Sequence, residues 1–332
     1  MDTVIKFFDK AWRFGRIASL ILILTAAGLG EGNHAYGSDR KTVVIYNLLS
    51  HPILDQSIAG IKEALREEVG KDMDLKISEV NANAQFNLLN AYAKEILANA
   101  PTVIVPISTP GTQAVAKEAP PEQAIVFSTV TNPNDVGMNT GPKNMTGVSD
   151  AVNYGANLDL IKIMLPKARR IGLIYNAGER NSQFGVEQVE RLAPSRDLMV
   201  SKVTVSNSNE VADAARALAK TVDVIYVGSD NTVVGAIDGL IAVAEESRVP
   251  VIASDVGSVE KGALAAISVD YHELGRAVGK IVAEILRTKK EPGTIKNVIF
   301  EGRSLILNAK TATRIGYKFS DLLRALSTRI IE

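Results

Sequence analysis

The sequence predicts an α/β protein with two doubly wound parallel sheets, each forming one lobe. Aliphatic and β-branched runs of strand length alternate with amphipathic helical segments, and this alternation starts again after residue 152. Short links between these segments favour right-handed βαβ units, which make parallel sheets. The length of 332 residues is enough for two such lobes.

The first half contains four expected strands. Residues 42–48 form a continuous apolar run, which is typical of a strand buried on both faces. Pro52 then suits a first helical turn, and the helix ends near Gly70. A third helix opens at Thr109-Pro110, with Thr109 as the expected cap. The other elements expected here are strands at 75–80, 102–107 and 124–130 and a helix at 87–100.

The second half repeats this pattern. We expect the Gly- and Asn-rich stretch 139–152 to join the halves, and extended segments at 264–269 and 298–307 to flank a last helix. Three crossings would then form a hinge, with lobe one at 38–150 plus about 270–298 and lobe two at 151–269 plus about 299–328. The expected elements are helices at 157–165, 182–192, 209–220, 232–246 and 272–286 and strands at 170–175, 199–205, 222–227 and 249–253.

The N-terminal segment has the pattern of an export signal. A basic stretch precedes an apolar run at 17–29, which is too short to span a membrane. We expect cleavage after Gly37, so that residues 1–37 are a signal peptide and the protein is periplasmic. An uncleaved anchor is the alternative. The chain has no Cys after this run, which excludes a bacterial lipoprotein.

Composition and motifs argue against several classes of function. Zero net charge and the lack of a basic cluster argue against nucleic-acid binding. Without Cys there is no thiol catalysis and no Cys-based metal site. Phosphate-loop, dinucleotide, nucleophile-elbow and zincin motifs are missing, and Ser258-Val259-Glu260-Lys261 lacks the partner motifs of S-x-x-K acyl enzymes. We therefore expect no enzyme activity, no cofactor and no metal.

Six expected strands end in small polar residues where a helix begins, three in each half. Ligands of open α/β sheets bind outside the carboxyl ends of the strands. Two such rims predict a cleft for a small polar molecule. The strand ends are Tyr46-Asn47, Ser108-Thr109, Thr131-Asn132, Tyr175-Asn176, Ser229-Asp230 and Ser254-Asp255.

Two acidic residues at these ends suit a ligand ammonium group. Asp230 directly precedes a helix, so helix capping explains it equally well. Asp255 precedes a sequence typical of a loop, so capping explains it less well. Ser108 and Thr109 open a helix whose N–H groups suit a carboxylate, although capping alone also explains Thr109.

The remaining candidates can also be explained either by ligand contact or by local hydrogen bonding at a helix start. His51 follows the first strand end and could reach the cleft, but such a histidine is more often a hydrogen-bonding residue at a helix start. The turn at 175–182 is more polar than capping requires. The full set of candidate ligand-binding residues is Asn47, Ser50, His51, Ser108, Thr109, Thr131, Asn132, Asn176, Glu179, Asn181, Ser182, Asp230, Asn231 and Asp255.

Several segments resemble the tryptophan/tyrosine-type ABC transporter substrate-binding proteins. They are YNAGERNS at 175–182, SDNTV at 229–233, ASDVGSVEKGALA at 253–265 and VDYHELGR at 269–276. His51-Pro52 with Leu54-Asp55, and LNAK at 307–310, fit the same pattern, and the resemblance runs from about residue 42 to 328. One departure is Asn132, where the family often has Thr-Asp-Pro.

The resemblance implies a type I periplasmic-binding-protein fold, a solute held between the lobes, and a membrane permease and ATPase as partners. Ser108 and Thr109 would hold a carboxylate, and Asp230 and Asp255 would face an amino group. We expect a monomer that captures an amino acid, aromatic in some relatives, and we expect Asp255→Ala to abolish binding. The alternatives are a secreted sensing subunit for a membrane receptor and a cleft hydrolase. A DNA-binding regulator is disfavoured, because the export signal occupies the place of a helix-turn-helix.

Overall fold

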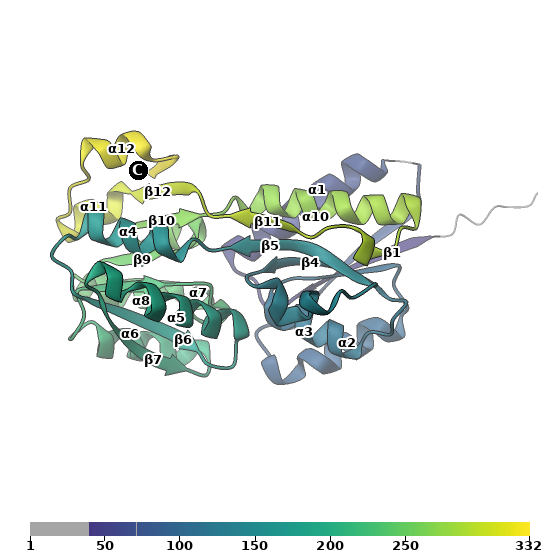
Figure 1. The fold of residues 1–332 in the computed structure, drawn as a ribbon, viewed down its shortest axis with the longest axis horizontal. Helices are drawn as coiled ribbons and strands as arrows, with labels where there is room; N and C mark the ends of the chain where they lie inside the picture. Colours follow the sequence, from purple (N-terminus) through teal and green to yellow (C-terminus); the bar gives the residue numbers. More distant parts are fainter. Residues whose placement is uncertain (1–39, 71) are drawn as a thin grey trace, which may run out of the picture. The chain divides into compact units, whose positions relative to one another are not determined.

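The computed structural model describes residues 40–70 and 72–332. The predicted export signal lies outside these residues. Two sheets, each flanked by helices, make up the described chain, as Figure 1 shows. The predicted fold class, α/β with two doubly wound sheets, is therefore confirmed. Among the described residues, no helix is long and apolar enough to cross a membrane.

Lobe one is built on a six-stranded, all-parallel sheet. The helices α1 (Pro52–Val69) and α10 (Tyr271–Thr288) lie side by side on it (Figure 1). Their backbones approach closely, because a Cβ added at Gly275 would lie 2.0 Å from the Ser57 carbonyl oxygen. Helices α2 (Leu89–Ala98) and α3 (Thr109–Glu118) also belong to this lobe. The strand order is β2 (Leu75–Asn81), β1 (Lys41–Asn47), β3 (Val103–Pro106), β4 (Ala124–Val130), β5 (Met145–Ala151) and β11 (Val298–Glu301).

Lobe two repeats this order in a seven-stranded sheet, in which β12 alone pairs antiparallel with its neighbour β10. The order is β7 (Met199–Val205), β6 (Arg170–Asn176), β8 (Val224–Val227), β9 (Val251–Ala253), β10 (Ala265–Ser268), β12 (Ser304–Asn308) and β13 (Arg329–Ile331). Its helices are α4 (Tyr154–Met164), α5 (Arg180–Leu192), α6 (Val211–Leu218), α7 (Asn231–Gly235), α8 (Ile237–Glu246), α9 (Val256–Lys261), α11 (Ala309–Ile315) and α12 (Asp321–Leu326).

In both sheets the chain adds strands first on one side of the lobe's first strand and then on the other, so the strand order reverses beside that strand. In lobe one the reversal lies between β1 and β3, and in lobe two between β6 and β8. Ligand sites of such sheets lie at the carboxyl ends of these strands. The chain passes from one sheet to the other after β5, after β10 and between β11 and β12.

The stretch 139–152, expected to be a linker, contains strand β5. This strand pairs with β4 on one side and β11 on the other, so it is interior to the sheet. Its glycine suggested a loop, but Gly147 is needed for packing. A Cβ there would lie 2.3 Å from the Phe127 carbonyl oxygen. Because strand β5 was not predicted, Asp150 near its end was not recognised as a residue of the cleft.

Three other expected elements are divided or begin more than two residues from the expected position. The segment 298–307 is two strands in different sheets, separated at Gly302-Arg303. The helix expected at 232–246 is interrupted at Ala236, which leaves α7 and α8. Helix α4 begins three residues before its expected start, because the Asn153 side chain accepts the Ala156 N–H at 2.9 Å and caps it.

Apolar side chains fill both faces of both sheets. In lobe one, Ile45, Ile61 and Val278 belong to the cluster between the sheet and the α1–α10 pair, and other clusters cover the remaining faces. These packed layers hold the strand ends in fixed positions, so that side chains from distant segments meet at the cleft.

Candidate functional site

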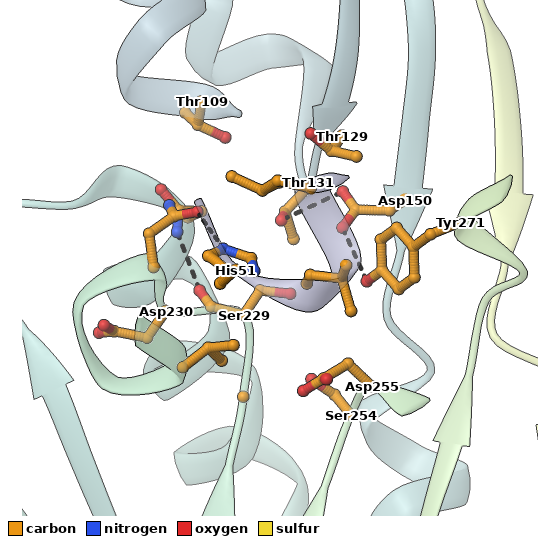
Figure 2. Close-up of a pocket in the computed structure, with 16 residues that line it drawn as sticks. His51, Thr109, Thr129, Thr131, Asp150, Ser229, Asp230, Ser254, Asp255 and Tyr271 are labelled. Atoms are coloured by element: carbon orange, nitrogen blue, oxygen red, sulfur yellow. Dashed lines mark hydrogen bonds between the residues drawn. The ribbon is translucent and has the colours of Figure 1, made fainter. Parts of the chain in front are cut away.

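A pocket lies where the carboxyl ends of strands from both sheets meet. Its cavity volume is about 20 Å³, and about 380 Å³ of non-atom space surrounds it when the opening to solvent is included. Figure 2 shows His51 in the middle of the labelled residues, with Thr109 and Thr131 from lobe one and Asp230 and Asp255 from lobe two around it. The site is therefore shared by the two lobes.

The structure brings together half of the candidate residues at this pocket. Those that line it are His51, Thr109, Thr131, Asn181, Asp230, Asn231 and Asp255. Those that do not are Asn47, Ser50, Ser108, Asn132, Asn176, Glu179 and Ser182. Two further lining residues, Ser229 and Ser254, were expected at strand ends on the cleft rim but were not among the candidates. Sequence reasoning missed the others, which are Ile53, Leu54, Thr129, Asp150, Gly228, Val234 and Tyr271.

Asp150 is the most informative of the missed residues. It is 4% exposed, and its carboxylate accepts only two long hydrogen bonds from side chains, from the Tyr271 hydroxyl at 3.2 Å and the Thr131 hydroxyl at 3.4 Å (Figure 2). Burial raises the pKa of Asp150 to about 7. A buried carboxylate with so few donors is suited to a cationic partner. Ser149-Asp150 at the end of an extended stretch was the signal that could have identified it.

The N-terminus of α3 presents unpaired polar groups. Ser108 and Thr109 are 2% and 1% exposed, and neither hydroxyl has a hydrogen-bond partner. The expectation that Thr109 caps the helix is wrong, because the helix starts at Thr109 and no side chain caps it. Ser108 has φ +73° and Thr129 has φ +54°, a strained region for residues with a Cβ. The free N–H groups and the dipole of this helix end suit an anion.

Asp230 is held by backbone and hydroxyl donors. Its carboxylate accepts the N–H of Asn176 at 2.6 Å and of Val233 at 2.8 Å, and the Ser182 hydroxyl. The capping interpretation is thus confirmed for this residue. Burial and the neighbouring Glu179 raise its pKa to about 7. Because three donors already occupy this carboxylate, it has less capacity for a ligand than Asp150.

Glu179 organises the start of α7 from within the lobe. It is fully buried and accepts the Thr232 N–H at 3.0 Å, the Thr232 hydroxyl at 2.7 Å and the Asn231 N–H at 3.2 Å. The side-chain amides of Asn231 and Asn181 also donate to it, at 2.5 and 3.2 Å. Glu179 therefore supports the pocket from behind and does not line it.

Four other candidates do not line the pocket and have hydrogen-bond partners within their own lobe. Ser50 donates to Asp55 at 2.7 Å, and Asn132 accepts the Asn134 N–H at 3.2 Å. Asn176 donates to Thr232 at 2.9 Å. Ser182 lines a second pocket of about 280 Å³ in lobe two, which shares Asp230 with the first.

The sequence interpretation of Asp255 was wrong in one respect. The residues after it form helix α9, and Asp255 is its N-cap. Its carboxylate accepts the Ser258 N–H at 2.7 Å and the Ser258 hydroxyl at 2.6 Å. Val-Gly-Ser suggested a loop because Gly and Val are weak helix formers, but the cap and burial stabilise the short helix. Burial raises the pKa of Asp255.

His51 stands at the N-cap position of α1 without capping it. It is 5% exposed, and burial lowers its pKa to about 4, so the ring is neutral near pH 7. Its Nε2 lies 3.5 Å from Asn231 Oδ1, which connects the two lobes. Its Nδ1 has no hydrogen-bond partner.

Other contacts also connect the lobes. Arg180 pairs with Asp135 at 3.4 Å. Gly257 lies so close to α1 that an added Cβ would be 2.9 Å from Pro52 Cβ. No cluster of three or more His, Cys, Asp or Glu residues suited to a metal ion occurs within 40–70 and 72–332.

Residues 42–331 match the family model described as ABC transporter substrate binding protein. The chain belongs to this family. A curated relative, the tyrosine-binding protein of Clostridioides difficile (strain R20291), is 32% identical over 315 residues, covering 89% of this chain and 91% of the relative. These matches agree with the resemblance expected from the sequence motifs.

Two solved structures are similar to this chain over most of its length. One is a Streptococcus pneumoniae ABC domain in complex with L-Trp, which is 28% identical, with 88% of this chain and 100% of the other covered and a TM-score of 0.83. The other is the ligand-free, open structure of a substrate-binding protein with adhesive properties from Clostridium difficile, which is 29% identical, with 88% and 99% covered and a TM-score of 0.64.

Proposed function

We propose that this protein is an extracytoplasmic binding protein that holds a free amino acid in the pocket and delivers it to an ABC permease for import. Asp150 is the observation that carries the proposal, because it is a buried carboxylate at the pocket whose side-chain donors are two hydroxyls at long distance and no cation. The ammonium group of a ligand would be the positively charged partner that this carboxylate does not have within the protein.

The opposite end of the ligand would be recognised at α3. The N–H groups at the start of this helix, with the unpaired hydroxyl of Thr109 beside them, would bind the ligand's carboxylate. One anionic and one anion-binding subsite in a single pocket are complementary to a zwitterion. The relatives named for tyrosine binding and solved with L-Trp support an amino acid as the ligand.

Ligand contact with both lobes would favour the closed arrangement of the lobes over the open one. The export signal proposed at residues 1–37 would place the protein outside the cytoplasm, as a monomer that docks on its transporter.

A ligand screen tests this proposal. Residues 38–332 would be screened by thermal shift against amino acids, sugars and small carboxylates. Ligand at 100 times its Kd should add about 2.7 kcal/mol of stability. Calorimetry would then compare the best amino acid with its N-acetyl and amide derivatives, each of which should bind about 2–5 kcal/mol more weakly. Equal affinity of the N-acetyl derivative, or turnover detected by mass spectrometry, would contradict the proposal.

A further inference from the structure

A chain of buried hydrogen bonds fixes the orientation of the Asn231 side chain. Both Glu179 oxygens accept hydrogen bonds, and Oε2 lies 2.5 Å from Asn231 Nδ2. A carboxylate that accepts through both oxygens requires a donor at this position, because the opposite amide orientation would set two oxygens against each other. Asn231 therefore turns its NH₂ group to Glu179 and its Oδ1 to His51.

The orientation of Asn231 determines which nitrogen of His51 carries the proton. Asn231 Oδ1 can only accept a hydrogen bond, and it lies 3.5 Å from His51 Nε2. The His51 ring is neutral because burial lowers its pKa to about 4. In a neutral imidazole with its hydrogen on Nε2, Nδ1 carries a lone pair and is an acceptor.

The acceptor at Nδ1 has no partner in the protein. His51 is 5% exposed, its Nδ1 has no hydrogen-bond donor, and the ring lies among the pocket residues in Figure 2. Hydroxyl groups also line this pocket, but none of them donates to Nδ1; they belong to Thr109, Thr129, Thr131, Ser229, Ser254 and Tyr271. Nδ1 therefore keeps a free lone pair that a donor on the ligand can fill.

We infer that His51 Nδ1 accepts a hydrogen bond from the side chain of the ligand, so that the pocket selects amino acids whose side chain ends in an O–H or N–H group. This inference rests on the proposed function, in which Asp150 takes the α-ammonium and α3 the α-carboxylate. Ile53, Leu54 and Val234 line the same pocket and suit an apolar body between backbone and donor. Phenol and indole side chains have this combination, whereas an acidic side chain would face three carboxylates.

Matched ligands that differ only in the donor test the inference. Calorimetry on residues 38–332, which contain both sheets, would compare L-Tyr with L-Phe, and L-Trp with 3-benzothienyl-L-alanine, whose sulfur replaces the indole N–H. In the unmodified chain the donor-bearing member of the pair that fits should bind at least about tenfold more tightly. In His51→Leu this ratio should fall to within about threefold. His272→Leu, the same substitution at a 39%-exposed side chain of α10 that pairs with Glu63 and does not line the pocket, should leave the ratio unchanged.

Ring ¹⁵N NMR gives a readout that does not depend on the stability of a variant. The chain from residue 38 contains two histidines, His51 and His272, which simplifies assignment. The ligand-free protein at pH 7 should show His51 as the Nε2–H tautomer, and only the donor-bearing ligand of the pair should shift the Nδ1 resonance.

Three results would overturn the inference. The Nδ1–H tautomer, or a charged ring at pH 7, would remove the acceptor. A donor preference that persists in His51→Leu would assign the selection to another group. If no amino acid binds, both the proposed function and this inference are wrong. If amino acids bind but ligands with and without the donor bind equally, only this inference is wrong.

Discussion

Replacing Asp150 with asparagine should stabilise the ligand-free protein and abolish tight ligand binding. Asp150 is buried beside two hydroxyl donors, and burial raises its pKa from 3.8 to about 7. When the pKa of a carboxyl group is higher in the folded than in the unfolded protein, the fold is most stable at a pH below the unfolded-state pKa. Stability is lost as the pH rises from the unfolded-state pKa to the folded-state pKa. Above pH 7 the ionised carboxylate therefore destabilises the fold.

The size of the effect follows from the shift. A difference of about 3 pKa units corresponds to about 4 kcal/mol at pH 8, and to about half of that at pH 5.5. Relaxation around the site reduces these values, so we expect Asp150→Asn to gain about 2–4 kcal/mol at pH 8 and clearly less at pH 5.5. Asparagine keeps an oxygen for one of the two hydroxyls without carrying the charge.

Urea denaturation of the ligand-free protein at both pH values would measure the difference. Asp230→Asn is a matched control, because the pKa of Asp230 is also raised to about 7 but its carboxylate accepts from two backbone N–H groups and a hydroxyl. An amide nitrogen would face donors there, so this variant should lose about 1–3 kcal/mol. The reasoning is refuted if Asp150→Asn is no more stable than the unmodified chain at pH 8, or if it binds the amino acid with unchanged affinity.

Three further predictions concern pH, lobe contact and backbone strain. Amino-acid affinity should fall about tenfold per pH unit below pH 7, because the ligand's ammonium group requires ionised Asp150. Asp150→Asn should bind weakly at every pH. Calorimetry in buffers of different ionisation enthalpy would count the protons released when the ligand binds. Gly257→Ala would place a Cβ 2.9 Å from Pro52 Cβ and should weaken ligand binding by about 1–3 kcal/mol. Gly239→Ala is the control, because its added Cβ would have its nearest atom at 3.6 Å and should not weaken binding. Equal Kd values for both variants would contradict a role for the contact between Gly257 and α1. Ser108→Gly should relieve the strain of φ +73° and raise stability by about 1 kcal/mol, and a lower Tm would contradict this.

Much of the fold could be predicted from the sequence. Apolar runs such as 42–48 and 124–130 identified strands, because a strand covered on both faces needs apolar residues at successive positions. Pro52 fixed the start of α1, and the polar residues at strand ends indicated the rim of the sheets where the pocket lies. These features depend on neighbouring residues in the chain.

The choice between capping and ligand contact could not be predicted from the sequence. Asp230 and Asp255 both precede helices and have the residue type of a cap, and the structure shows that both cap. Asp150 was missed because β5 is recognised by its pairing with β4 and β11, and Gly147 within it suggested a loop. Its partner Tyr271 is 121 residues away in the chain.

The sequence by itself determined the fold class, most of the helices and strands and the family resemblance, because these follow from local patterns of apolar and polar residues. Only the tertiary structure decided that Thr109 Oγ1 and His51 Nδ1 remain unpaired at the pocket, and that two hydroxyls are the side-chain donors to Asp150. The physical reason is that burial and hydrogen bonding are set by segments that meet only after folding. His51 and Asn231, which are 180 residues apart, show this most directly, because the proton position on the His51 ring depends on their contact.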